Sequence, residues 1–136
     1  MDRKESMKFL AVIKVAYPTA YRDLDEASAE ATVNMWQQSF PDTPFGIISI
    51  AFDNFRRRSK FAPTVAEINE ELSKLYYKAL EDANMHKFMG NDDGLTKCRY
   101  IMQCTAGFRK NETRINYGKV TPKMISERTP YLLGGD

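Results

Sequence analysis

The side chains with the most reactive chemistry in this chain of 136 residues are one histidine and two cysteines. His86 has no second histidine and no nearby cysteine pair, so the ligand set of a zinc site is missing. Cys98 and Cys104 are separated by five residues, which is neither the C-x-x-C spacing of redox motifs nor zinc-finger spacing. We interpret all three as ordinary helix residues and predict no metal site and no cofactor.

Acidic residues and glycine motifs give no support for catalysis either. Glu70, Glu71, Glu81 and Asp82 fall within a predicted helix, and we interpret them as a solvated face because charge runs are usually exposed. The chain has neither G-x-x-x-x-G-K-S/T nor G-x-G-x-x-G, the motifs that cradle nucleotide phosphates. Since no coherent catalytic set is present, the sequence predicts a protein that is not an enzyme.

Basic residues form a first candidate site in the run Arg56-Arg57-Arg58-Ser59-Lys60. This run falls at the expected C-terminus of a helix, where cations interact favourably with the helix dipole. That structural role is our first interpretation, and contact with nucleic acid or a partner is the second. The candidate residues of this secondary basic patch are Arg56, Arg57, Arg58 and Lys60.

The second candidate site is the basic segment 95–136, which carries eight basic and three acidic side chains interleaved with four aromatic rings. Basic and aromatic residues on a poorly ordered segment suit coupled folding and binding to a partner. They also suit single-stranded nucleic acid, and a merely soluble tail is the remaining interpretation. The candidate partner-binding residues are Arg99, Arg109, Lys110, Arg114, Tyr117 and Lys119.

The composition of the chain limits the kind of protein that can position these residues. Hydrophobic residues make up 43% of the chain, which is enough for a buried core, and the net charge is only +2. That balance predicts weak or absent direct binding to nucleic acid. Two cysteines are compatible with a reducing cytoplasm, and no apolar run is long enough to cross a membrane. We therefore expect a cytoplasmic protein without a membrane partner.

Hydrophobic periodicity predicts two helices before residue 41. Residues 3–17 place Met7, Leu10, Ile13 and Tyr17 on one face, and Pro18 ends the segment. The next helix is expected to start from a cap at Asp23 or Asp25 and to run to about Phe40. Its buried stripe is expected to include Val33, Trp36 and Phe40.

Two further helices are predicted before residue 90. One opens at Thr43-Pro44 and carries Ile48, Phe52 and Phe55, although residues 46–50 alone also fit a buried strand. The other begins at a capping box formed by Thr64 and Glu67, and its apolar stripe could continue to Met85. The expected fold is an all-α bundle of about four helices. The expected core residues are Leu10, Ile13, Trp36, Phe40, Ile48, Phe52, Phe55, Ile68, Leu72 and Leu75.

The domain organisation follows from glycine and charge. Six of the seven glycines lie at Gly90 or beyond, and residues 90–94 have the composition of a linker. We predict a helical domain over residues 1–89 and a linker over 90–94. Residues 95–136 are then a basic C-terminal region, partly disordered and largely irregular, with one short helix near Cys98.

Three groups of residues occur in a set order along residues 3–75. They are Arg3-Lys4-Glu5 with Ala16-Tyr17-Pro18, then Ala31-Thr32-Val33-Asn34-Met35-Trp36 with Phe40 and Pro44-Phe45, then Ser59-Lys60-Phe61-Ala62-Pro63-Thr64-Val65-Ala66-Glu67-Ile68. In this order they resemble the phage replicative-helicase loader and inhibitor family. The resemblance implies a small helical N-terminal domain followed by a flexible C-terminal region.

The resemblance also implies a function. Such a protein is a non-enzymatic adaptor in the host bacterial cytoplasm that binds the hexameric replicative helicase, phage-encoded or host, and delivers it to the phage origin. While bound it inhibits the ATPase of the helicase, and an origin-binding initiator protein triggers release. The family's main helicase contact is in the C-terminal region, but residues 95–136 match no family motif.

Two other classes of protein compete with the adaptor. A DNA-binding replication or regulatory module would use the third and fourth helices as a helix-turn-helix, with Arg56–Lys60 near phosphates. Against that class, Glu67, Glu70 and Glu71 on the presumed recognition helix would repel the phosphate backbone. An inhibitor of another host enzyme is the third class.

Overall fold

The computed structural model describes residues 1–109, and over that range it contains α-helices and one 3₁₀ turn but no strand. The predicted all-α class is confirmed, including a helix rather than a strand over residues 46–50. The elements are α1 (Arg3–Ala16), α2 (Glu26–Ser39), α3 (Phe45–Arg56), α4 (Val65–Met89), α5 (Asp92–Thr105) and the 3₁₀ turn η1 (Ala106–Phe108).

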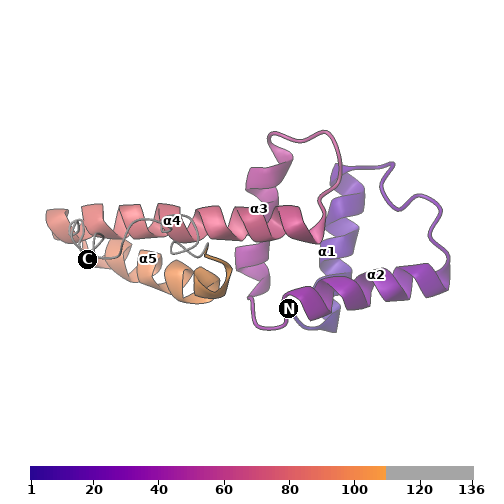
Figure 1. The fold of residues 1–136 in the computed structure, drawn as a ribbon, viewed down its shortest axis with the longest axis horizontal. Coiled ribbons are helices and arrows are strands. Elements are labelled where there is room, and N and C mark those ends of the chain that lie inside the picture. The colour runs from indigo at the N-terminus through magenta and orange to yellow at the C-terminus, as the bar shows by residue number, and fades with distance from the viewer. Residues whose placement is uncertain (110–136) are drawn as a thin grey trace, which may run out of the picture.

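The 25-residue helix α4 forms the long axis of the described part of the chain (Figure 1). Its N-terminal part crosses α3 at a steep angle, and α1 and α2 gather at the same end. Its C-terminal part extends away from these helices with α5 packed along it. The described chain therefore consists of a four-helix unit, formed by α1, α2, α3 and the N-terminal part of α4, and a helical hairpin, formed by the C-terminal part of α4 and α5.

Side-chain caps fix the starts of these helices. The Asp25 carboxylate accepts a hydrogen bond of 2.7 Å from the backbone N–H of Ser28, which settles the cap of α2. At α4 the Thr64 hydroxyl accepts from the Glu67 N–H while the Glu67 carboxylate accepts from the Thr64 N–H. This reciprocal pair is the predicted capping box, and it satisfies backbone donors that the helix leaves free.

Aromatic rings from three helices form the centre of the core. Phe9 packs edge-on against both Trp36 and Phe52, with ring centroids 5.0 and 5.6 Å apart. All ten predicted core residues are buried or partly buried. One prediction about α1 is wrong, however, because Met7 is exposed and the buried stripe runs instead through Ser6, Phe9, Leu10 and Ile13.

The turn between α4 and α5 differs from the predicted linker of residues 90–94. Only Gly90 and Asn91 separate the two helices, because α5 begins at Asp92. Gly90 adopts a left-handed conformation with φ of 73°, which ends α4, and the Asn91 side chain accepts from the Gly94 N–H to cap α5. Turn-forming residues at this point thus serve as the caps of two adjacent helices.

Helix α5 is longer than the short helix expected near Cys98, and it packs against the rest of the fold. Cys98 is buried with Ala79 and Ala83 of α4 in a second small core. Ile101, Cys104 and Phe108 reach the main core, where the ring centroids of Phe108 and Phe40 lie 5.8 Å apart. The helical packing therefore continues beyond residue 89 to η1.

The end of α4 is apolar but exposed. Met85, expected on the buried stripe, lies on the surface with Phe88 and Met89, and Phe88 is 91% exposed. The buried stripe of α4 follows Ala79 and Ala83 instead, because α5 covers that face. No helix within residues 1–109 combines the length and the apolar character that crossing a membrane requires.

Candidate partner-binding surfaces

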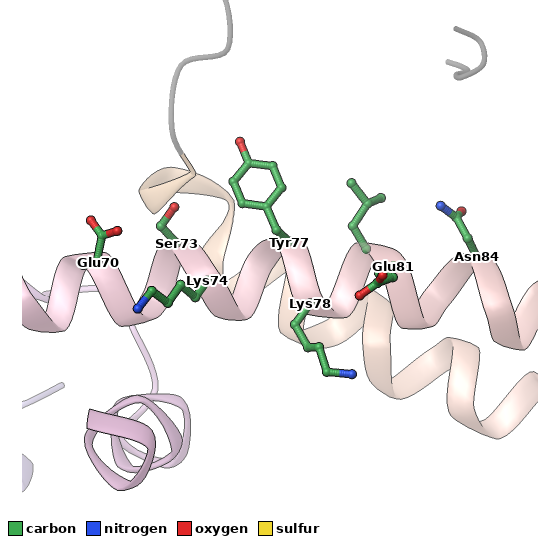
Figure 2. Close-up of a pocket in the computed structure, with 8 residues that line it drawn as sticks. Glu70, Ser73, Lys74, Tyr77, Lys78, Glu81 and Asn84 are labelled. Atoms are coloured by element: carbon green, nitrogen blue, oxygen red, sulfur yellow. The ribbon is translucent and has the colours of Figure 1, made fainter. Parts of the chain in front are cut away.

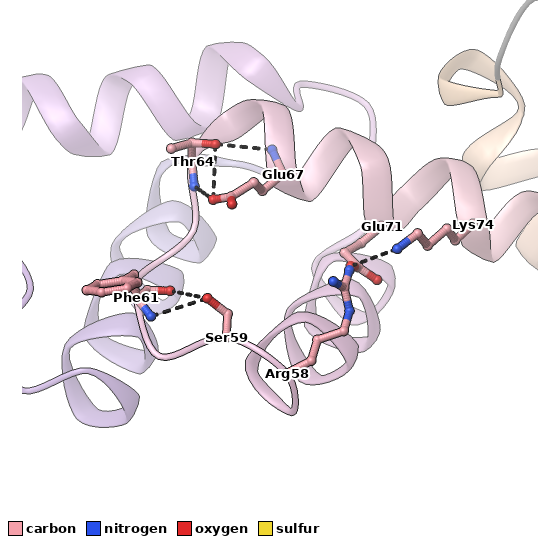
Figure 3. Close-up of polar contacts among 7 residues, drawn as sticks. All are labelled: Arg58, Ser59, Phe61, Thr64, Glu67, Glu71 and Lys74. Atoms are coloured by element: carbon pink, nitrogen blue, oxygen red, sulfur yellow. Dashed lines mark hydrogen bonds and ion pairs between the residues drawn. The ribbon is translucent and has the colours of Figure 1, made fainter.

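The predicted basic patch lies at the end of α3 and in the loop that leads to α4, residues 57–64, which we call the α3–α4 loop. Arg56 pairs with Asp53 of its own helix at 3.1 Å. Arg58 pairs with the carboxylate of Glu71 on α4 (Figure 3). The structure thus brings two of the four predicted cations into ion pairs within the fold.

Glu71 is not part of a solvated face, contrary to the prediction from the sequence. Its side chain is only 3% exposed, and besides Arg58 it has the Lys74 ammonium at 3.8 Å. A buried carboxylate is stable only when it is paired, and the chain supplies the partner by folding the loop back over α4. Sequence periodicity alone missed this pair because Arg58 lies outside the helix.

Hydrogen bonds hold the α3–α4 loop in one shape. The Ser59 hydroxyl donates to the carbonyl oxygen of Phe61 at 3.0 Å and accepts from its N–H at 3.2 Å (Figure 3). The Tyr17 hydroxyl of α1 donates to the Ser59 carbonyl oxygen at 3.0 Å. Burial raises the pKa of the Tyr17 phenol, which keeps this donor protonated well above neutral pH.

Two of the C-terminal candidate residues lie in the described part of the chain. Arg99 is exposed on α5. Arg109 follows η1, where its guanidinium lies 5.5 Å from the centroid of the Tyr76 ring on α4. The other four candidates, Lys110, Arg114, Tyr117 and Lys119, lie outside the described residues.

A hollow of about 720 Å³ lies along one face of α4 (Figure 2). Its lining combines carboxylates and ammonium groups, among them Glu70, Lys74 and Glu81, with the Tyr77 ring. Lys78 is held by both carboxylate oxygens of Asp82 at 2.9 Å, and this bonding raises the pKa of the ammonium. The lining carries charges of both signs around a mostly apolar surface, and it offers no paired nucleophile and base.

A second hollow, of about 660 Å³, lies between the start of α3 and the middle of α5. Ile47, Ile50, Tyr100 and Ile101 make its lining mostly apolar, and Lys97 is its charged residue. A hydrogen bond with Cys104 raises the pKa of the Tyr100 phenol, so the ring stays neutral. The hollow is therefore an uncharged surface apart from the Lys97 ammonium.

The residues singled out for chemistry are dispersed. Cys98 is a free, buried cysteine and Cys104 is a half-buried one. His86 lies 3.2 Å from the side-chain amide of Asn91 at the helix turn. Over residues 1–109 no group of three or more potential metal ligands comes together.

A comparison with known families adds to this geometry. Residues 1–69, half of the chain, match the model of the N-terminal domain of a phage helicase loader family. No curated protein and no solved structure matches the chain. The match covers α1, α2, α3, the α3–α4 loop and the start of α4, and it confirms the resemblance seen in the sequence. The chain therefore belongs to this family of phage replicative-helicase loaders, which are non-catalytic adaptors.

Proposed function

We propose that this protein binds a hexameric replicative helicase, inhibits its ATPase while bound and helps to load it at the phage origin. The observation that carries the proposal is the match of residues 1–69 to the loader family. The helicase is encoded by the phage or by its host, and an origin-binding initiator protein triggers its release. The protein itself binds DNA weakly or not at all.

The main helicase contact in this proposal is the basic segment 95–136. Its eight basic and three acidic side chains favour an acidic partner surface. Arginine and aromatic side chains are the usual anchors of protein interfaces, and the segment supplies both. The proposed contact residues are Arg99, Arg109, Lys110, Arg114, Tyr117 and Lys119.

A pull-down with the purified phage and host helicases tests the proposal. The full chain and a chain truncated after Arg109 serve as baits, because the shorter chain keeps every described helix. We expect the full chain to retain one of the helicases and the truncated chain to retain much less. Failure of the full chain to retain either helicase would refute the proposal.

A DNA-binding module remains the second candidate, because α3 and α4 are adjacent and Arg57 and Lys60 are exposed between them. Glu71 no longer argues against this candidate, since Arg58 and Lys74 balance its charge. A mobility shift with duplex DNA at several salt concentrations separates the two candidates. Tight, salt-dependent binding by the isolated protein would favour the DNA-binding module.

A further inference from the structure

We propose that the α3–α4 loop is a second helicase contact, in which the Phe61 ring enters an apolar socket and Arg57 and Lys60 pair with carboxylates at its rim. This inference rests on the proposed function and adds to it, because the contact lies on the four-helix unit rather than in segment 95–136. The observations that carry it are the exposure of Phe61, the hydrogen bonds that fix the loop and two exposed cations of the same loop.

Phe61 is 78% exposed, whereas Phe9, Phe40, Phe52 and Phe55 lie in the core. In Figure 3 its ring points away from the Arg58–Glu71 pair. Isolated exposed apolar residues are common on protein surfaces, so exposure alone identifies no site. What distinguishes Phe61 is the way its backbone is held.

Four anchors fix the chain on both sides of the ring. Before Phe61, Arg58 is tied to Glu71 and the Ser59 carbonyl oxygen accepts from Tyr17. At Phe61, both backbone polar groups bond to the Ser59 hydroxyl. After it, the capping box at Thr64 starts α4. A ring presented by a fixed loop loses little conformational entropy on binding, which favours its use as an anchor.

The cations of the α3–α4 loop and of the end of α3 indicate the chemistry of the partner. Arg56 and Arg58 are committed to Asp53 and Glu71. Among the ion pairs of residues 1–109, none involves the exposed cations Arg57 and Lys60. Both lie in the same loop as Phe61, and the proposal pairs them with carboxylates around the socket that receives the ring.

A protein partner fits this arrangement better than single-stranded nucleic acid. Proteins that bind single strands stack successive bases on several rings and follow the phosphates with a charged groove. The loop presents one ring and two cations, and Glu67 and Glu70 follow on the next helix. A single aromatic anchor with charged neighbours is instead the usual form of a protein hot spot.

The test compares two exposed phenylalanines, Phe61 in the loop before α4 and Phe88 in the last turn of α4. We would measure the affinity of full-length wild type, Phe61→Ala and the matched control Phe88→Ala for the replicative helicase that wild type binds. We expect Phe61→Ala to weaken binding about tenfold or more, as for a hot-spot residue. Phe88→Ala is expected to stay within about twofold of wild type, as for a residue outside the contact.

A charge variant makes the test independent of the ring. Arg57→Glu combined with Lys60→Glu should weaken binding and reduce its dependence on salt, because it removes the proposed carboxylate pairs. Thermal unfolding by circular dichroism checks that each variant folds. If Phe61→Ala does not fold, the charge variant decides alone.

The outcomes separate this inference from the proposed function. Wild-type affinity in both the Phe61→Ala and the charge variant would overturn the loop contact while leaving helicase binding intact. Absence of binding by wild type would overturn both. If instead Phe61→Ala keeps its helicase affinity and loses binding to a single-stranded oligonucleotide, the loop is a nucleic-acid contact and the inference is wrong.

Discussion

At the scale of single residues, Trp36 shows how much the core depends on one side chain. Its indole is fully buried, stacked on Phe40 with centroids 6.0 Å apart and met edge-on by Phe9. Within residues 1–109 its ring N–H has no hydrogen-bond partner. The residue therefore contributes through packing, and its polar atom adds a cost.

Replacing Trp36 by alanine should lower the free energy of unfolding by about 3–5 kcal/mol, as for other large buried aromatics. Trp36→Phe should cost less, because it keeps a ring in the site and removes the unpaired N–H. Urea unfolding of the three proteins measures both effects. An unchanged midpoint in Trp36→Ala would show that the indole is not part of the core.

The carboxylate of Asp25 should make the stability of the fold depend on pH. Hydrogen bonds from Ser28 hold the pKa of this carboxyl below its usual value, and the bond from the Ser28 backbone N–H has the largest effect. A lowered pKa stabilises the fold above the usual aspartate range, and this stabilisation is lost as pH falls through the lowered pKa.

The melting temperature of wild type relative to Asp25→Asn should therefore fall as the pH drops below about 3.9, the usual aspartate pKa. Asparagine also caps helices but does not titrate, so the comparison isolates the charge. Asp23→Asn, which changes a carboxylate just before the cap, is the control. A constant difference in melting temperature at every pH would contradict the assignment.

At the scale of elements, the sequence predicted the features that depend on residues close together along the chain. Apolar periodicity and the caps at Asp25 and Thr64 gave four of the helices and nearly all of their core faces. Sequence patterns failed where packing between distant elements decides which residues are buried. Glu71 is buried and paired with Arg58, and Met85 is exposed. The basic patch was found from composition, but the fixed position of Phe61 depends on hydrogen bonds that no periodicity reveals.

Two glycines should respond to alanine with opposite sign. Gly90→Ala should destabilise the fold by about 1 kcal/mol or more, because its left-handed backbone is unfavourable for a side chain. Gly46→Ala should stabilise it by about 0.5–1 kcal/mol, since the residue is helical and a methyl group there meets open space. Chemical denaturation measures both changes, and a shift of the same sign would refute the assigned backbone roles.

Removal of α5 should lower the stability of the four-helix unit. A chain ending at Asn91 loses Ile101, Cys104 and Phe108, which cover the main core. Compared with a chain ending at Arg109, it should melt several degrees lower and bind more of a dye that detects exposed apolar surface. Equal melting temperatures would show that α5 is an independent appendage.

At the scale of the whole molecule, a net charge of only +2 hides an uneven distribution. Residues 63–94 carry three basic and seven acidic side chains, and residues 95–136 carry eight basic and three acidic ones. A basic region on a nearly neutral protein favours attraction to one acidic partner surface over general binding to polyanions.

Arg109→Glu combined with Lys110→Glu should therefore reduce the association rate with the helicase by about tenfold at low salt, and the difference should shrink as salt rises. The dissociation rate should change less, because long-range charge acts mainly on encounter. Surface plasmon resonance at several salt concentrations measures both rates. An effect confined to dissociation would place these residues in the packed centre of the interface.

We propose above all that this protein is an adaptor that binds the replicative helicase and inhibits its ATPase while bound. The most direct measurement is a titration of the hexameric helicase with the full chain, in which occupancy and ATP hydrolysis are recorded in the same samples. We predict saturable binding, with hydrolysis falling in proportion to occupancy. Hydrolysis that remains unchanged at full occupancy, or the absence of any complex with either the phage or the host helicase, would show that the protein is not such an inhibitor.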